Sequence, residues 1–309
     1  MWYFYNEFNS DKLESLINEI NGVFMRIFTN DEFDYPTWVN GIKLKEDFEN
    51  FKQAFQLSKQ DEKEKLKNAY INNIQVKKVC NLVVEPVTYE VMLLGASSEF
   101  IRCINALKTI QDYLYNNLLK LKGHIETVGT LKDYYEEFYD KSVEYVCPFC
   151  GLGTMLTSKD KFREAFDHYL PRSKYPFVSL LRENLYPICH TCNSTYKGDK
   201  NPRDFGKVFY PFSKEDNDCE PVFNIKSGVI ENIEINSLRS QEEIETWNEV
   251  FDIKDRIKNF AEINLSGWMS NVSEAVGIYN IDFDTAKNAE IERCRSNKMQ
   301  DHKFIKKAT

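Results

Sequence analysis

The chain has 309 residues, a formal net charge of −8, 42% hydrophobic residues and 28% charged residues. This length exceeds what one hydrophobic core usually serves, so we expect two or three domains. The composition is typical of a globular protein and excludes a disordered chain. The sequence has no apolar run of about 18 residues and no basic, apolar leader, which predicts neither a membrane span nor a signal peptide and indicates a cytoplasmic protein.

Apolar residues recur at intervals of three and four over much of the first half of the chain, the spacing of amphipathic helices. The predicted helices cover 13–27, 44–75 with a break near Ser58, 98–122 with an end at Gly123, and 131–142. Residues 29–43 predict a loop, and residues 75–87 fit either a strand or a buried irregular segment. We therefore assign residues 1–140 to a helical N-terminal domain.

The last third of the chain changes its pattern after a boundary near residue 212. Alternation over 222–235, around Ser227-Gly228, predicts a β-hairpin. Helical spacing resumes over 242–265, and two further helices fit the remainder. Residues 213–309 are therefore expected to form an α/β region that is mostly helical.

Two Cys-x-x-Cys pairs lie between these regions. Two residues between ligands let a tight turn direct both thiolates at one ion, and a second such turn completes a tetrahedral zinc site. A redox dithiol or four buried cysteines are the alternatives, and two pairs in one compact segment favour zinc over both. Four thiolates leave no open coordination position, so we expect a structural zinc and interpret His190 as a surface residue. The predicted ligands are Cys147, Cys150, Cys189 and Cys192.

The charge of the chain is unevenly distributed. Residues 147–207 carry ten Lys/Arg and six Asp/Glu, a net charge of +4, so the rest of the chain carries −12. Phosphate binding depends on the local field rather than on the total charge. This segment is therefore the expected place for nucleic acid. The candidates for phosphate contacts are Arg172, Lys174, Lys197, Lys200 and Arg203.

The residues between and after the cysteine pairs carry a further pattern. Asp167-His168 is followed by x-x-Pro, and Asn184 begins the run Asn-Leu-x-Pro-x-Cys-x-x-Cys-Asn-x-x-x-Lys, in which the last Asn is Asn193. Over roughly residues 145–203 this combination resembles the HNH endonucleases, whose site is a ββα-metal fold. Several coupled features in the right order make the resemblance specific, whereas a lone Asp-His would carry no weight.

The resemblance implies a role for each of these side chains. His168 falls on the general base, Asp167 on a metal ligand, and Asn184 on the second-strand residue that orients the loop of the histidine. Asn193 falls on the metal-binding position at the start of the helix, where the family's name has a final His, so the site resembles the HNN variant of RNA-guided nucleases. Alternation along a strand would point Asp167 and His168 to opposite faces, so a twist, a bulge or access from the edge of the strand must bring both to one phosphate. Oxygen ligands favour Mg²⁺ or Mn²⁺ over zinc.

We therefore expect an α+β protein, mainly helical, with an embedded zinc-stapled ββα-metal domain over residues 141–212. The implied activity is metal-dependent hydrolysis of phosphodiester bonds, with DNA as the family's usual substrate and RNA left open. The alternative is a zinc-organised module that binds nucleic acid or a partner without cutting it.

A looser resemblance concerns the flanking regions. The helical N-terminal region, the Tyr-Pro-Phe segment and the Trp-containing helical tail are similar to nucleases of Septu-type and retron-associated anti-phage systems. It implies antiviral defence beside an ATPase partner. A homo-oligomer and a stand-alone restriction-type enzyme are the alternatives.

Overall fold

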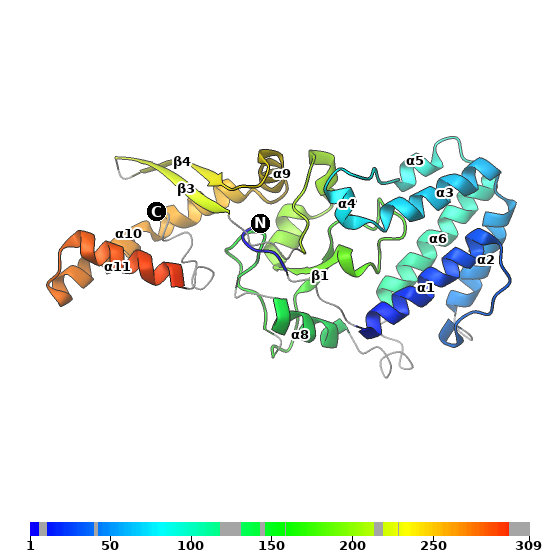
Figure 1. Cartoon of the computed structure of the whole chain (residues 1–309), viewed down its shortest axis with the longest axis horizontal. Coiled ribbons are helices and arrows are strands. Elements are labelled where there is room, and N and C mark those ends of the chain that lie inside the picture. Colours follow the sequence, from blue (N-terminus) through cyan, green and yellow to red (C-terminus); the bar gives the residue numbers. More distant parts are fainter. Residues whose placement is uncertain are drawn as a thin grey trace. The chain divides into compact units, whose positions relative to one another are not determined.

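Figure 1 shows the computed structural model of the chain, which describes residues 1–5, 11–39, 43–117, 131–142, 146–157, 159–212, 219–227 and 229–296. Helices predominate, and the described residues contain two small sheets of two strands each. This confirms the α+β class in its coarse form. Within the described parts of the chain, no helix combines the length and the apolarity that crossing a bilayer requires.

The chain divides into two compact units, and each unit joins segments that are far apart in the sequence. We call them the helical unit, Phe8–Phe138 with Phe166–Pro187, and the cysteine unit, Met1–Glu7 with Tyr139–Ala165 and Ile188–Thr309. The segment 141–212 contributes to both units. The predicted division into domains at residues 140 and 212 stays a prediction.

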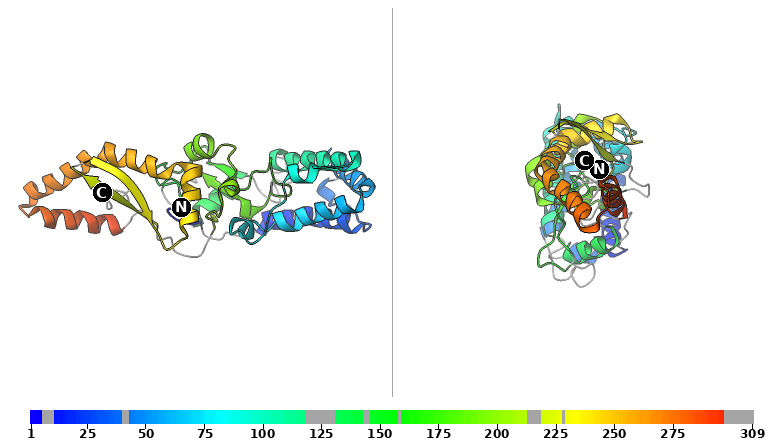
Figure 2. Two further views of the ribbon diagram at one scale, coloured as in Figure 1. Left: turned by 90° about the horizontal axis from the view of Figure 1, so that it is seen from above. Right: turned by 90° about the vertical axis from the view of Figure 1, so that its left-hand side faces the viewer.

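Four longer helices lie side by side in the helical unit (Figures 1 and 2). They are α1 (Asp11–Thr29), α2 (Lys43–Leu57), α3 (Gln60–Asn73) and α6 (Ser98–Asn117). The shorter elements are η1 (Thr37–Val39), α4 (Val76–Cys80) and α5 (Tyr89–Leu93), and α8 (Leu131–Ser142) follows α6 in the chain. The helix predicted over 131–142 is confirmed by α8.

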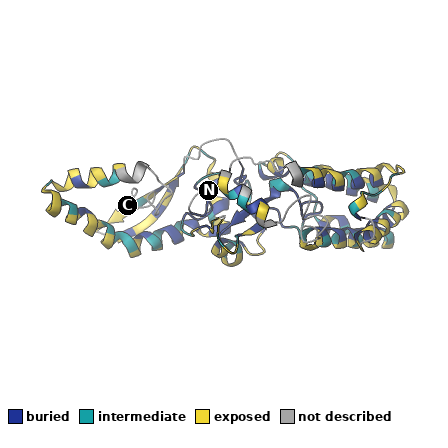
Figure 3. Ribbon diagram, turned by 90° about the horizontal axis from the view of Figure 1, so that it is seen from below, coloured by how far each residue is buried: buried dark blue, intermediate teal, exposed yellow. Residues whose placement is uncertain are grey.

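The core of the helical unit consists largely of aromatic rings that recur every three or four residues. Phe24 of α1 packs edge-on against Phe48 and Phe51 of α2, with ring centroids 5.5 and 5.7 Å apart. Helix α2 also packs along α6. Each helix therefore turns one apolar face inward, and Figure 3 shows buried residues on the inner sides of these helices and exposed residues on the outer sides.

Most of the helix boundaries in this unit follow the predictions. The backbone N–H of Ser58 closes the last turn of α2, and α3 begins two residues later, which confirms the predicted break. The segment 75–87 differs from both expectations, because it contains the short helix α4. The helix predicted over 98–122 is confirmed as far as Asn117, and its predicted end at Gly123 lies outside the described residues.

Strands β1 (Ala165–His168) and β2 (Leu185–Ile188) pair with each other, and a long connection joins them. Phe177 anchors this connection in the helical core, with its ring centroid 5.2 Å from that of Phe24 and 5.1 Å from that of Tyr70. The left-handed backbone of Phe177, with φ of 68°, costs roughly 1–3 kcal/mol for such a residue. Burial of its ring contributes a stabilisation of about the same size, roughly 1.5–3 kcal/mol.

The cysteine unit contains the remaining sheet and helices. Strands β3 (Glu220–Lys226) and β4 (Val229–Asn236) pair antiparallel, which confirms the predicted hairpin. They are followed by α9 (Gln241–Phe251), α10 (Ile253–Tyr279) and α11 (Phe283–Ser296). Helix α10 packs against β4 and α11 (Figure 2), and the helices predicted beyond residue 242 are confirmed.

The first five residues form an extended segment of the cysteine unit. The backbone N–H of Trp2 donates to Pro148 O at 2.8 Å, and that of Tyr5 donates to Pro211 O at 2.9 Å. The indole of Trp2 packs edge-on against Trp247 of α9, with ring centroids 5.0 Å apart. This segment thereby joins parts of the unit that are distant in sequence.

Candidate functional site

Four cysteine side chains converge in the interior of the cysteine unit. Their Sγ atoms lie within 4.8 Å of one another, and they belong to Cys147, Cys150, Cys189 and Cys192. Cys150 Sγ and Cys189 Sγ are 3.9 Å apart. A tetrahedral zinc site with Zn–S bonds of ~2.3 Å has sulfur–sulfur edges of about 3.8 Å. The residues present therefore fit a metal ion such as zinc.

The first cysteine pair sits on a tight turn that the backbone stabilises. The N–H of Cys147 donates to Gly153 O at 2.7 Å, and the N–H of Gly153 donates to Cys150 Sγ at 3.3 Å. Gly151 has φ of 68°, a left-handed conformation that glycine adopts without a steric penalty. A Cβ atom on Gly153 would lie 2.7 Å from Cys189 Sγ, so this position must remain free of a side chain.

The pKa values of three of the thiols are shifted in different directions. Burial raises the pKa of Cys147 and Cys192 well above the usual value, because a thiolate is poorly solvated in the interior. Hydrogen bonds from Cys147, Cys189 and Cys192 lower the pKa of Cys150 well below the usual value. Four thiolate ligands would thus form only as a bound cation displaces the remaining protons.

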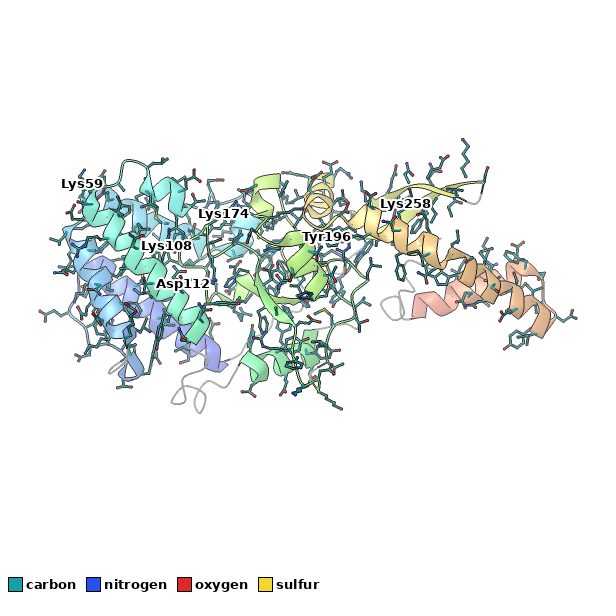
Figure 4. The ribbon with its side chains drawn as sticks, turned by 180° about the vertical axis from the view of Figure 1, so that it is seen from behind. Lys59, Lys108, Asp112, Lys174, Tyr196 and Lys258 are labelled. Atoms are coloured by element: carbon teal, nitrogen blue, oxygen red, sulfur yellow. The ribbon has the colours of Figure 1, made fainter. Side chains whose placement is uncertain are left out.

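Arg256 of α10 brings a positive charge to this cluster. Its Nη1 donates to Cys192 Sγ at 3.3 Å and to Phe251 O at 3.0 Å. Its guanidinium lies 3.9 Å from the ring centroid of Tyr196, which Figure 4 labels. Burial alone would lower the pKa of Arg256, but attraction to Cys192 and Cys150 in their thiolate forms keeps it above the ordinary value. Arg256 is therefore suited to balance the charge of a thiolate cluster.

Asn193 lies on η4 (Thr191–Lys197), a π-helical segment that follows Cys189 almost directly. The backbone N–H of Asn193 donates to Cys189 O at 3.0 Å, and the N–H of Gly198 reaches across five residues to Asn193 O at 2.8 Å. Asn193 is half-buried. The predicted location of Asn193 in the first turn of a helix is confirmed.

His168 is the last residue of β1 in the helical unit, and only 8% of it is exposed. Its Nε2 lies 2.8 Å from the backbone carbonyl oxygen of Ser179. A carbonyl oxygen only accepts, so the ring must carry its proton on Nε2, and in the neutral ring the lone pair is on Nδ1. The ring of Tyr115 packs against His168 with centroids 4.7 Å apart. The geometry fixes both the tautomer and the orientation of the imidazole.

Asn184 holds the loop that follows His168. Its Oδ1 accepts from Leu170 N at 2.8 Å, and its Nδ2 donates to Leu170 O at 3.0 Å and to Val178 O at 3.2 Å. The prediction placed Asn184 on the second strand, whereas the structure has it at the end of η3 (Arg182–Asn184), one residue before β2. From this turn the side chain of Asn184 reaches Leu170 and Val178 at once, while its backbone carbonyl accepts from Tyr169 N at 3.1 Å.

Asp167 precedes His168 on β1 and faces different groups. It is half-buried, and its Oδ2 accepts from the hydroxyl of Tyr186 at 2.9 Å. The neighbouring side chains thus have separate contacts, as the alternation of a strand predicts. Asp167, His168 and Asn184 belong to the helical unit, while Asn193 belongs to the cysteine unit.

Two of the basic candidates lie in the helical unit. Arg172 forms an ion pair with Asp112 of α6, and its guanidinium lies 4.8 Å from the ring centroid of Tyr115. Lys174 is half-buried, and its backbone carbonyl accepts from the N–H of Tyr89. Figure 4 labels Lys174 together with Asp112 of α6. Arg172 is thereby connected to His168 through the ring of Tyr115.

The other three basic candidates lie in the cysteine unit, and their side chains have partners there. Lys197 is only 2% exposed, which removes its ammonium from the surface that a nucleic acid could reach and corrects its predicted role. Lys200 Nζ donates to Glu249 O at 2.9 Å, and Arg203 Nη1 donates to Gly206 O at 3.3 Å. Lys200 is exposed and is the most accessible of the three.

Four residues of these two sites have no motif in the sequence that indicates a role: Arg256, Ser179, Gln111 and Tyr115. Arg256 bonds to a cysteine 64 positions away, and Ser179 bonds to Gln111 68 positions away. Such residues belong to no motif of fixed spacing, and Ser179 contacts His168 through its backbone, which any residue type provides. Only the placement of Gln111 and Tyr115 four residues apart on a predicted helix could have indicated a shared face.

The chain is similar in part to a phage protein. It is 34% identical over 95 residues to "Protein ea31" of Escherichia phage lambda, over 30% of this chain and 27% of the phage protein. The chain thus matches only about a quarter of the length of that relative, and the printed name states no activity. No family model matches the chain, and no solved structure matches it.

Proposed function

We propose that this protein is a metal-dependent endonuclease of the HNH type that hydrolyses phosphodiester bonds of DNA. The observation that carries the proposal is the hydrogen bond between His168 Nε2 and Ser179 O, at 2.8 Å. It fixes a proton on Nε2, so that in the neutral imidazole the lone pair is on Nδ1, the form that a general base requires. Two strands followed by a helix, in the order β1, β2 and η4, are what a ββα unit needs along the chain.

In this proposal the side chains have separate tasks. His168 Nδ1 accepts a proton from the attacking water, while Asn184 holds the loop after β1 in place. Asp167, whose carboxylate accepts from Tyr186, and Asn193 are the ligands that the sequence pattern implies for Mg²⁺ or Mn²⁺, which when bound would neutralise charge on the scissile phosphate and on the leaving 3′ oxygen. The products would be a 5′-phosphate and a 3′-hydroxyl.

The four cysteines have a structural task. Four buried thiolates would close the coordination shell of zinc, so this ion would not touch substrate. Arg172 and Lys174 are the proposed phosphate contacts nearest to His168 in the chain. A role in antiviral defence, with an ATPase partner or a second copy of the chain, stays a prediction that co-purification with neighbouring gene products and size-exclusion chromatography would test.

The test is a nicking assay on supercoiled plasmid with Mg²⁺ or Mn²⁺, with single-stranded DNA and RNA as further substrates. His168→Ala should lower the cleavage rate roughly 10²–10⁴-fold, the range that general acid–base groups contribute. His190→Ala is the matched control, because His190 is an exposed histidine in the same segment. Zinc content and circular dichroism of both variants should equal those of the parent.

Cleavage by His168→Ala at the parental rate would remove the nuclease role of His168. The burial of His168 under Tyr115 favours a second candidate, a zinc-organised module that binds nucleic acid without cutting it. A parent chain that retains DNA on a filter but never nicks it, with either metal, would support that module.

A further inference from the structure

Helix α6 belongs to the N-terminal helical region, yet its side chains approach the segment that carries His168. We propose that α6 positions the general base, and that Gln111, acting through Ser179, fixes the imidazole with its lone pair on Nδ1. This inference rests on the proposed nuclease function. Gln111 and Ser179 are positioning residues, since neither touches the reacting atoms.

A continuous chain of hydrogen bonds links α6 to His168. Gln111 Oε1 accepts from Ser179 Oγ at 2.6 Å, and Ser179 O lies 2.8 Å from His168 Nε2. Gln111 and Ser179 are 4% and 3% exposed, so water does not compete for these bonds. Phe177, anchored in the helical core two residues before Ser179, limits the movement of the same loop. The carbonyl that selects the tautomer is therefore held from two sides.

A second contact of α6 fixes the plane of the ring. Tyr115 lies one helical turn after Gln111, so both side chains project from the same face of α6. Its ring is inclined by 57° to that of His168, with centroids 4.7 Å apart. The guanidinium of Arg172 lies over the ring of Tyr115 and pairs with Asp112, which is also on α6. Helix α6 thus contributes a hydrogen-bond acceptor and an aromatic ring to the surroundings of His168, and its Asp112 pairs with the Arg172 that lies over this ring.

A small cavity lies beside the hydrogen-bond chain. It has a volume of about 30 Å³, and its polar lining comes from Asn21 of α1, Gln111 and Ser179. Gln111 Nε2 is buried and has no hydrogen-bond partner among the described residues. A cavity of this size holds one water molecule, which would satisfy this donor and keep the amide oriented toward Ser179.

The proposal predicts a specific kinetic effect of Gln111→Leu, which keeps the side chain's bulk and removes its acceptor. In the plasmid assay, kcat should fall roughly ten- to a hundredfold with KM unchanged, as for a displaced catalytic group. Ser179→Ala should have a similar effect, Ser179→Thr should restore most of the activity, and the double variant Gln111→Leu/Ser179→Ala should be no worse than either single one. Asn105→Ala, at an exposed position of α6, is the control.

Nitrogen NMR of the histidine ring gives a readout that does not depend on activity. In the parent, His168 should be the Nε2–H tautomer, and in Gln111→Leu it should be a mixture of both tautomers, with the thermal unfolding of each variant measured alongside. If the parent cuts DNA and His168→Ala does not, unchanged kcat in Gln111→Leu and Ser179→Ala overturns the positioning role. A parent that never cuts DNA removes the nuclease function, and an Nδ1–H tautomer in the parent removes this inference separately.

Discussion

Gly153 lies so close to Cys189 that any side chain there would occupy the space of a metal ligand. The nearest atom to a Cβ at this position would be Cys189 Sγ, at 2.7 Å. The Sγ atom cannot retreat without leaving the cluster of four cysteines. A single methyl group is therefore expected to act on the metal site directly, although Gly153 itself binds no metal.

Gly153→Ala should lower the zinc content of the purified chain and destabilise the fold by about 1–3 kcal/mol, the usual penalty for overpacking. Inductively coupled plasma spectrometry and urea unfolding measure the two effects. Gly22→Ala, in α1, is the control, because a Cβ there meets nothing within 4 Å. It should leave zinc content unchanged and stabilise the chain by roughly 0.5–1 kcal/mol.

At the scale of elements, helix α2 combines a buried apolar face with one buried carboxylate. Asp47 is 7% exposed, and its Oδ2 has no hydrogen-bond partner in the described parts of the chain. Burial raises the pKa of Asp47 above its ordinary value. The folded state therefore binds this proton more tightly than the unfolded state, and stability is lost as the pH rises through the folded-state pKa.

Asp47→Asn should accordingly raise the melting temperature at about pH 7, well above the unfolded pKa, because the burial of Asp47 disfavours its carboxylate. The gain should vanish near pH 3, below the unfolded pKa of about 3.9, where both states are protonated. Differential scanning calorimetry at the two pH values measures this difference. Glu46→Gln, at the exposed neighbouring position, should change stability by less than about 0.5 kcal/mol at either pH. An equal gain for Asp47→Asn at both values would contradict the burial argument.

Local periodicity was enough to predict the long helices and the hairpin, because each of them presents one apolar face to a core. It failed for α4, whose five residues are too few for a helical period, and whose Val76 and Val79 resemble a strand. Cysteine spacing predicted the metal cluster, because the two ligands of each Cys-x-x-Cys pair are only three positions apart and their spacing is visible in the sequence. The bond from Ser179 to His168 could not be predicted, because a backbone carbonyl has no sequence signature.

At the scale of the whole molecule, the chain passes between its two units several times. The four cysteines join two segments of the cysteine unit, Tyr139–Ala165 and Ile188–Thr309. Cys147 and Cys150 precede the helical unit's second segment, Phe166–Pro187, and Cys189 and Cys192 follow it. A bound ion would therefore close a loop that contains β1 and β2. Loss of that ion should affect one unit first.

A strong zinc chelator should unfold the cysteine unit and leave the helical unit intact. Hydrogen exchange should accelerate in α9 and α10, whose Trp247 and Arg256 contact the turn and the cluster, because the binding free energy of a structural zinc is folding free energy. Exchange in α1, α2 and α6 should stay slow, and added zinc should restore protection. Uniform loss of protection in both units would contradict this separation.

The extended segment at residues 1–5 has a consequence for the order of synthesis. Its partners are Pro148, Pro211 and Trp247, so residues 1–5 must wait for partners that are translated later, the last of them Trp247. Domains generally fold from the N-terminus as they emerge, yet Trp2 remains an exposed indole until α9 has been made. During that interval residues 1–5 lack the partners that cover them, and the residues of the helical unit, which end at Pro187, are all translated before those of α9.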